Sequence, residues 1–416
     1  MILKRIAISS KVVALLLVAG VWCSCNNTDK SAGQAIDSLL SLTFPENEPG
    51  AAVVVMRGDS VVFGKGYGLS RLPVTGQDEA GRVERWNKDS ICLRDDNRID
   101  CNTSFNIASC SKQFTAVAVL QLAERGLVSL QDPICTYFPE LQSDIFRSVT
   151  VAHLLSHSSG IPDKRGYLTR QQRIDGDEKL SVEYLHTLDS LHFSAGTDYE
   201  YVNPTYVLLG MLVERISGKE FTEYMRNNIF LPAGMSLTSY FDRNRQYLLP
   251  DMAHGYEYGE LEGMSEERTA QRTTTAKKWY ECDFGEETFF ATRPDGGIYT
   301  SANQLVLWER ALRNALAGAD GAIVDGGLLK DAMSVHTKVT GSRWSDYQNR
   351  PDTYYGYGWF VEPSKQVIYH TGDNGGFKAY IGRYPNLDMT VIILSNRTDW
   401  DRYHLKTQIE QLLPNL

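Results

Sequence analysis

Strand-forming segments lie near the two ends of this chain, and helical patterns occupy the stretch between them. Near the start, the apolar runs 51–56 and 60–63 flank Gly58-Asp59, which is the pattern of a β-hairpin. Further strand-like runs appear near the end, at 297–300, 357–361, 366–369, 379–384 and 389–395. A sheet assembled from both ends, with a helical domain inserted between them, explains this order.

The helical part is clearest at residues 111–125, where apolar residues recur at helical spacing and Gly126 ends the segment. Shorter helices are predicted at 35–42, 151–156, 206–216, 221–227, 304–316 and 403–413. The predicted domains are the first part of the sheet domain at 35–103, a mainly helical domain at 104–290 and the second part of the sheet domain at 291–416. Polar residues predict an irregular excursion at 70–103 and an exposed insertion at 260–278.

The first 25 residues have the pattern of an export signal. Three basic residues precede the apolar run 12–22, and Cys23-Ser24-Cys25 follows it. The small residue Ser24 directly before Cys25 resembles the cleavage site of bacterial lipoproteins, in which the new N-terminal cysteine is acylated. We therefore expect a signal peptide at 1–24, a lipid anchor on Cys25, a polar tether at 25–34 and a periplasmic or outer-membrane location in the cell envelope. A plain cleaved signal and a retained anchor are the alternatives.

The charge balance excludes some classes of ligand. The chain has 42 Lys and Arg against 51 Asp and Glu, a net charge of -9, and removal of the signal would make it more acidic. Such a chain is a poor ligand for nucleic acid or anionic lipid, so neither is expected as a binding partner. Any membrane attachment would depend on the lipid anchor.

Cysteines and histidines do not form a metal-binding pattern, and no metal or other cofactor is expected. His153 and His157 are four residues apart, but no Glu of the zinc-protease pattern lies between them and no third ligand presents itself. Cys92 and Cys101 flank a turn-like sequence, so a disulfide between them is one possibility in an oxidising compartment. The other cysteines of the mature chain are expected to be small buried residues.

Ser109-Cys110-Ser111-Lys112 is the first fragment that could carry chemistry. A serine hydroxyl needs a base nearby to act as a nucleophile, and a lysine three residues later, at the start of a helix, lies on the same helix face. Burial and the positive end of the helix dipole both lower the pKa of a lysine. A neutral Lys112 could therefore take the proton of Ser109. The alternative is a helix-capping serine followed by a solvated lysine.

Two further fragments contain suitable polar groups. In Tyr201-Val202-Asn203, a phenol could relay a proton and an amide could bind a substrate carbonyl. In His370-Thr371-Gly372, which follows the strand-like run 366–369, the glycine would allow a substrate to approach a strand edge, where a backbone N–H could form half of an oxyanion hole. Taken singly, each fragment is also compatible with ordinary packing.

In the order Ser-x-x-Lys, Tyr-x-Asn, His-Thr-Gly, the chain resembles the serine beta-lactamase-like superfamily over residues 45–400. That superfamily includes class C beta-lactamases, D-alanyl-D-alanine carboxypeptidases, D-aminopeptidases and related esterases. Supporting matches lie at 105–109, 113–116, 153–161, 296–301 and 392–396. The resemblance implies an α+β fold of the beta-lactamase/DD-peptidase type, which is an α/β sandwich with a central antiparallel sheet plus an inserted all-α domain. The site would lie between the two parts.

The resemblance also implies roles for individual residues. Ser109 would attack an acyl carbonyl, Lys112 assisted by Tyr201 would remove its proton, and Tyr201 would protonate the leaving group and later activate water. Asn203 would hold the substrate amide, and the N–H groups of Ser109 and Asp373 would form the oxyanion hole. The predicted substrate-binding residues are Asn203, His370, Thr371, Gly372 and Asp373.

One departure from the family pattern bears on the substrate. Many beta-lactamases and carboxypeptidases have lysine where this chain has His370, and a histidine is largely neutral near pH 7. The sequence therefore predicts an exported serine hydrolase that acts on a peptide, a D-amino-acid amide or an ester, with cell-wall peptides among the candidates. The alternatives are a true beta-lactamase, a D-alanyl-D-alanine carboxypeptidase, and a catalytically silent receptor for cell-wall peptides.

Overall fold

The computed structural model describes residues 27–72, 97–141, 143–169, 172, 176–240, 251–259, 279–282, 292–340 and 352–416. The predicted signal peptide, Cys25, Cys92 and the predicted insertion at 260–278 lie outside the described residues. Among the helices that are described, none combines the length and the apolar character needed to cross a bilayer.

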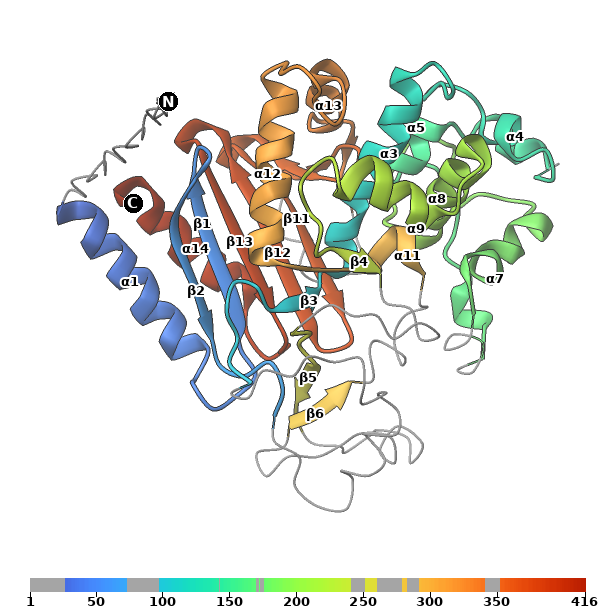
Figure 1. Ribbon diagram of the computed structural model, residues 1–416. Coiled ribbons are helices and arrows are strands. Elements are labelled where there is room, and N and C mark those ends of the chain that lie inside the picture. Colours follow the sequence, from blue (N-terminus) through green and yellow to red (C-terminus); the bar gives the residue numbers. More distant parts are fainter. Residues whose placement is uncertain are drawn as a thin grey trace, which may run out of the picture.

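Within the described residues, the main sheet has 8 strands in the order β2-β1-β13-β12-β11-β10-β9-β8, and every neighbouring pair is antiparallel (Figure 1). The strands are β1 (Ala51–Arg57), β2 (Ser60–Tyr67), β8 (Thr337–Lys338), β9 (Tyr354–Tyr355), β10 (Phe360–Glu362), β11 (Val367–Asn374), β12 (Phe377–Tyr384) and β13 (Met389–Ser395). β1 pairs with β13 from Ala51↔Ser395 to Arg57↔Met389. The early hairpin thus joins the last strand, as the sequence order predicts.

Each face of this sheet is covered, because successive residues of a strand point to opposite sides. On one face, alternate residues of β1 pack with α1 (Asn27–Thr43) and α14 (Arg402–Leu412) in a buried cluster that includes Ile36, Leu40, Val53, Val55, Ile393, Leu405 and Ile409. On the other face, the intervening residues pack with α12 (Ala302–Leu316) in a second cluster that includes Ala52, Val54, Ile392, Leu305 and Trp308. The result is a layered sandwich (Figure 1).

The helical part lies beside the second face. Its elements are α3 (Lys112–Glu124), α4 (Ile134–Tyr137), α5 (Val151–Leu155), α7 (Glu178–Val182), α8 (Asn203–Ser217) and α9 (Phe221–Met225), and α13 (Gly326–Ala332) packs against α12. α3 is buried from Lys112 to Leu122, and its Phe114 ring stacks on Trp308 at 4.1 Å between centroids. A helix buried on all sides at the centre of the molecule provides a rigid support for its first residue, Lys112.

Two short sheets complete the described structure. β3 (Ser104–Asn106), β7 (Ile298–Ser301) and β4 (Ser239–Tyr240) form one, and β5 (Gly255–Tyr258) and β6 (Trp279–Cys282) form the other. The pairing of β3 with β7 brings the segment before Ser109 next to the short helix α11 (Arg293–Gly296).

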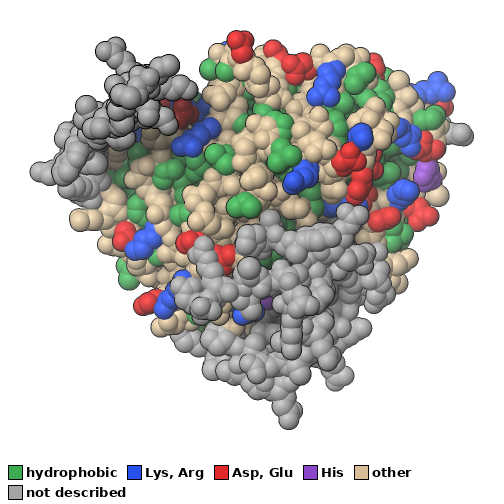
Figure 2. Space-filling model, in the orientation of Figure 1, with side chains coloured by type: hydrophobic (Ala, Val, Ile, Leu, Met, Phe, Trp, Pro, Cys, Tyr) green, Lys and Arg blue, Asp and Glu red, His purple; other side chains and the backbone are tan. Residues whose placement is uncertain are grey.

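Acidic and basic side chains are intermixed on the face seen in Figure 2, mainly over the helical part, rather than separated into patches of one sign. The net charge of -9 therefore does not produce one large acidic patch on this face.

Several element boundaries differ from the sequence-based expectation. β11 continues through the His370-Thr371-Gly372 fragment to Asn374, because its pairing with β12 extends to Asn374↔Phe377. α1 begins at Asn27, inside the segment expected to be a tether, and α8 begins at Asn203, three residues before its predicted start. Cys101 is a half-buried free thiol rather than half of a disulfide.

Candidate active site

A tight turn presents Ser109 at the start of the central helix. The 3-10 helix η1 (Ala108–Ser111) leads directly into α3, and Ala108 has a φ of +46, a conformation that is costly for a residue with a Cβ. The Asn106 side chain stabilises this turn, since its Oδ1 accepts a hydrogen bond of 2.7 Å from the Ala108 N–H. Ser109 is partly exposed, whereas Cys110 and Ser111 are buried. The turn therefore leaves Ser109 partly accessible while its Oγ lies against Lys112.

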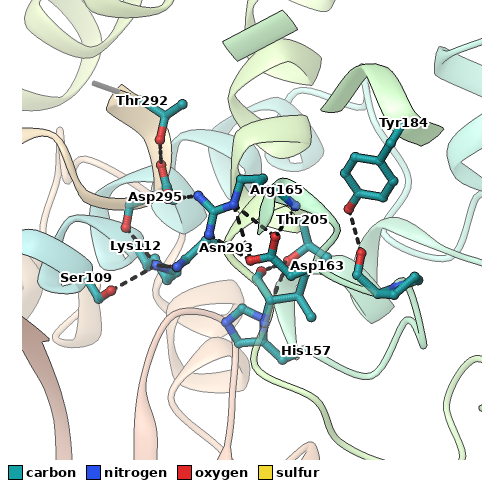
Figure 3. Close-up of polar contacts among 12 residues, drawn as sticks. Ser109, Lys112, His157, Asp163, Arg165, Tyr184, Asn203, Thr205, Thr292 and Asp295 are labelled. Atoms are coloured by element: carbon teal, nitrogen blue, oxygen red, sulfur yellow. Dashed lines mark hydrogen bonds and ion pairs between the residues drawn. The ribbon is translucent and has the colours of Figure 1, made fainter. Parts of the chain in front are cut away.

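Lys112 is fully buried directly behind Ser109 (Figure 3). Its Nζ lies 3.1 Å from Ser109 Oγ and donates to Asn203 Oδ1 and to the backbone oxygen of Asp295, both at 2.7 Å. Amide and carbonyl oxygens can only accept hydrogen bonds. In a neutral lysine the two N–H groups would satisfy these two oxygens, which leaves the nitrogen lone pair facing the hydroxyl of Ser109.

The environment of Lys112 favours this neutral form. Burial lowers the pKa of Lys112 to about 7, with the Asp295 carboxylate raising it and the Arg165 guanidinium lowering it further. The aromatic rings of Tyr201 and Tyr206 lie 4.9 and 5.5 Å from Nζ and contribute to the burial of the amine. The unprotonated form of Lys112 is therefore more accessible near neutral pH than that of a solvated lysine.

Tyr201 lies beside both groups, as the Tyr-x-Asn fragment predicts. Burial raises the pKa of its phenol well above the usual value, and the nearby Ser109 hydroxyl lowers it, although the two hydroxyls do not reach full hydrogen-bond geometry. The ring lies 4.2 Å from the His157 ring and 6.3 Å from the His370 ring, measured between centroids. The structure thus brings the three predicted catalytic residues, Ser109, Lys112 and Tyr201, into one cluster.

His370 occupies an interior position next to that cluster. It is 1% exposed, its Nδ1 lies 2.6 Å from the Thr371 carbonyl oxygen and its Nε2 lies 2.9 Å from the Tyr355 hydroxyl. Because a carbonyl only accepts, the ring proton is on Nδ1, and the Tyr355 hydroxyl donates to Nε2. Burial lowers the pKa of His370 to about 3, so the ring stays neutral. Both ring nitrogens are therefore engaged within the protein.

The strand edge at Gly372 packs directly on the turn that carries Ser109. A Cβ added at Gly372 would lie 2.2 Å from the Ile107 carbonyl oxygen, so a side chain there would force the two segments apart. β10 pairs with β11 only up to Tyr369, and among the described residues no other strand pairs with 370–374 on that side. This edge of β11, which includes the predicted residues Thr371 and Asp373, therefore lies next to Ser109.

Arg402 of α14 fixes this edge from the other face of the sheet. Its Nη2 donates to the Gly372 carbonyl oxygen at 2.9 Å and to Asp373 Oδ1 at 2.6 Å, and Arg402 is buried. The peptide group between Gly372 and Asp373, whose N–H is one of the two predicted oxyanion donors, is thus held at its oxygen by a cation.

Two further residues belong to the site: Asp295, which the sequence did not single out, and His157, which was considered there only as a metal ligand. Asp295 is 2% exposed and directly precedes the Gly296-Gly297 pair of a family-like segment, which was the available signal. His157, with a φ of +57, accepts from the Val202 N–H at 3.3 Å and packs its ring on Tyr201. Asn203 was predicted to bind substrate, and the structure shows its Oδ1 holding Lys112.

Comparison with solved structures places this fold. The octameric penicillin-binding protein homologue from Pyrococcus abyssi superimposes with a TM-score of 0.67 at 23% identity, covering 93% of this chain and 76% of that chain. A penicillin binding protein from Bacillus halodurans gives a TM-score of 0.66 at 22% identity, covering 91% of this chain and 98% of that chain. These similarities confirm the predicted fold class of helices and antiparallel sheet.

Sequence comparison extends the similarity to the family level. A penicillin-binding protein of Bacillus subtilis (strain 168) is 26% identical over 313 residues, which is 73% of this chain and 62% of the relative, so the match spans less than two thirds of that protein. The Beta-lactamase family model matches residues 42–413, and the resemblance predicted from the three fragments is thereby confirmed. The chain belongs to the Beta-lactamase family.

Proposed function

We propose that this protein is an exported serine hydrolase that works through an acyl-Ser109 intermediate. The contact of 3.1 Å between Lys112 Nζ and Ser109 Oγ carries this proposal, because two obligate acceptors on the far side of the amine leave its lone pair for the serine proton. Family membership supports the same chemistry, since the family consists largely of serine hydrolases.

In the proposed reaction, Ser109 Oγ forms a bond to the substrate acyl carbon while Lys112 takes the serine proton. The N–H groups of Ser109 and Asp373 bind the resulting oxyanion. The bond to the leaving group then breaks, and Lys112 returns its proton through Tyr201 to the leaving atom. Water later attacks the acyl carbon, gives up a proton to the same pair, and releases the acid with Ser109 regenerated.

A peptide, a D-amino-acid amide or an ester is the proposed substrate. The buried, neutral His370 supports this preference, because it offers no cation to the carboxylate that beta-lactams and D-alanyl-D-alanine peptides carry. The penicillin-binding names of the relatives favour the second candidate, a beta-lactamase or carboxypeptidase. Rapid hydrolysis of nitrocefin would favour that candidate over the first.

The proposed location is the cell envelope, with the protein held by an acylated Cys25. The basic residues, apolar run and Ser24-Cys25 pair of the first 25 residues support this placement.

A fluorophosphonate probe, which phosphonylates activated serines, tests the nucleophile. The purified protein should be labelled and Ser109→Ala should not be, while Ser111→Ala, two residues away in the same fragment, should keep the label. Equal labelling of the wild type and Ser109→Ala would remove Ser109 from the reaction. A silent receptor predicts no labelling of any form, together with a thermal shift when cell-wall peptides bind.

The pH dependence of acylation follows from Lys112. Since the neutral amine is the base and the pKa of Lys112 is lowered to about 7, the protonated, inactive form predominates below that pH. We expect kcat/KM for an ester substrate to rise with pH through a midpoint near 7. A rate that is flat from pH 5 to 9 in stopped-flow acylation would contradict the assignment of Lys112 as the base.

A further inference from the structure

Near Lys112, the charged side chains of Asp295, Arg165 and Asp163 follow one another in a line (Figure 3). The carboxylate of Asp295 lies 3.8 Å from Arg165 Nη1, measured from its Oδ2, and its Oδ1 accepts a hydrogen bond of 2.6 Å from Thr292. Arg165, in the short helix η3 (Arg165–Tyr167), donates through Nε and Nη2 to both oxygens of Asp163 at 3.0 and 2.7 Å. The charges alternate in sign along this line.

The line connects the interior with the surface. Side-chain exposure rises from 2% at Asp295 to 11% at Arg165 and 26% at Asp163. Its members come from separate segments, since Asp295 belongs to α11 and the other two to the loop around η3. Buried ion pairs in such a site are screened only slightly by salt, so each charge acts strongly on its neighbour.

Asp295 is the member closest to Lys112, because its own backbone oxygen accepts the lysine hydrogen bond. The other titratable or charged groups around Lys112 are Cys110 of η1, His157 after α5, Tyr201 before α8, Tyr206 on α8 and His370 on β11. Burial holds both histidines in the neutral form, and it holds the thiol and the phenols in their protonated forms. The charges that act on Lys112 are therefore those of Asp295, Arg165 and Asp163. Burial raises the pKa of the Asp295 carboxyl, and the neighbouring Lys112, Arg165 and Thr292 lower it.

We propose that Asp295 and Arg165 are positioning residues that set the proton affinity of Lys112, with Asp163 holding Arg165 in place. The inference deepens the proposed function, on which its kinetic consequence rests. The negative charge of Asp295 stabilises the ammonium form of Lys112, and the positive charge of Arg165 opposes it. Because these two effects on the pKa oppose each other, Lys112 can both accept a proton during acylation and give it up again afterwards.

This balance predicts opposite effects for the two charges. Asp295→Asn keeps the shape and the Thr292 hydrogen bond but removes the negative charge, so Lys112 should lose its proton at a pH lower by about one unit. Arg165→Gln removes the opposing positive charge, so the midpoint should rise by a similar amount. In the double variant the two shifts should largely cancel.

The experiment follows the titration of Lys112 itself by NMR in protein labelled at the lysine Cε, with the Lys112 signal assigned by its loss in Lys112→Met. The pH at which labelling by the fluorophosphonate probe is half-maximal is measured in parallel. Arg165→Lys, which keeps the charge, should stay near the wild-type midpoint. Arg293→Gln is the matched control, because Arg293 is on the same helix α11 but forms ion pairs with Glu178 and Glu220 instead.

A structural role for these charges predicts a different result. Both variants would then unfold at lower temperature while the NMR midpoint of Lys112 stayed within a few tenths of a pH unit of the wild type, and this would overturn the proposal. Shifts of the same sign in Asp295→Asn and Arg165→Gln would overturn it as well. Opposite NMR shifts without any probe labelling would support the role of the two charges and count against the proposed hydrolase alone.

Discussion

Lys112→Met is expected to slow acylation of Ser109 by about 10²–10⁴-fold, the range typical for loss of a general base. Methionine has a similar length and suits a buried position, but it has no lone pair that can accept the serine proton. The rate is measured as kcat/KM for a p-nitrophenyl ester and as the rate of probe labelling. Thermal unfolding is followed at the same time, because Asn203 Oδ1 and the Asp295 carbonyl lose a donor.

The control for this variant is Lys406→Met. Lys406 is also a buried lysine, with its Nζ 2.6 Å from Glu410, and it lies on α14 on the opposite face of the sheet from Ser109. Its replacement should affect stability but leave the acylation rate within a few-fold of the wild type. If Lys112→Met acylated as fast as Lys406→Met, another group would have to be the base, and Tyr201 would be the first candidate.

Gly372→Ala is expected to lower kcat by about 10²–10³-fold, as does the loss of one oxyanion-hole donor in other hydrolases. The added Cβ would lie 2.2 Å from the Ile107 carbonyl oxygen and 3.1 Å from Ala108 Cβ, so the strand edge must move away from the turn that presents Ser109. That movement separates the N–H of Asp373 from the N–H of Ser109. The measurement is kcat for the ester substrate, with circular dichroism to confirm that the fold is retained.

Gly64→Ala is the matched control for this substitution. Gly64 is a strand glycine of the same sheet, on β2, and its added Cβ would have its nearest neighbour at 3.4 Å, an ordinary contact. Its kcat should equal that of the wild type. Unchanged kcat in Gly372→Ala would mean that the oxyanion is bound elsewhere than at this edge.

Much of the fold follows from periodicity that the sequence carries locally. Both sides of β1, β13 and α3 are covered in the structure, so these elements are made of nearly continuous apolar residues. Such runs are recognisable from the sequence alone. The continuation of β11 through Thr371 and Asp373 is not recognisable, because these residues are polar. Its cause is tertiary, since the pairing with β12 continues to the turn at Gly375 and Gly376.

The site was predictable only where its residues are neighbours in sequence or part of an ordered set of fragments. The spacing of Ser109 and Lys112 predicts their contact because one helical turn separates them. The line from Asp163 to Asp295 could not be predicted in this way. Asp163 and Arg165 are far from Asp295 in the sequence, and the two segments become neighbours only through packing. Asn203 was predicted to bind substrate, whereas the structure shows its Oδ1 accepting a hydrogen bond from Lys112, a contact that the sequence did not indicate.

The guanidinium of Arg402 also has an electronic consequence for the peptide group that it touches. A cation at the Gly372 carbonyl oxygen draws electron density toward that oxygen, and the N–H of Asp373, which shares the same amide resonance, becomes more acidic and a stronger donor. Helix α14 therefore influences how well a developing negative charge is bound on the far side of the sheet. Shortening the protein before this helix would weaken that binding even if every residue around Ser109 stayed in place.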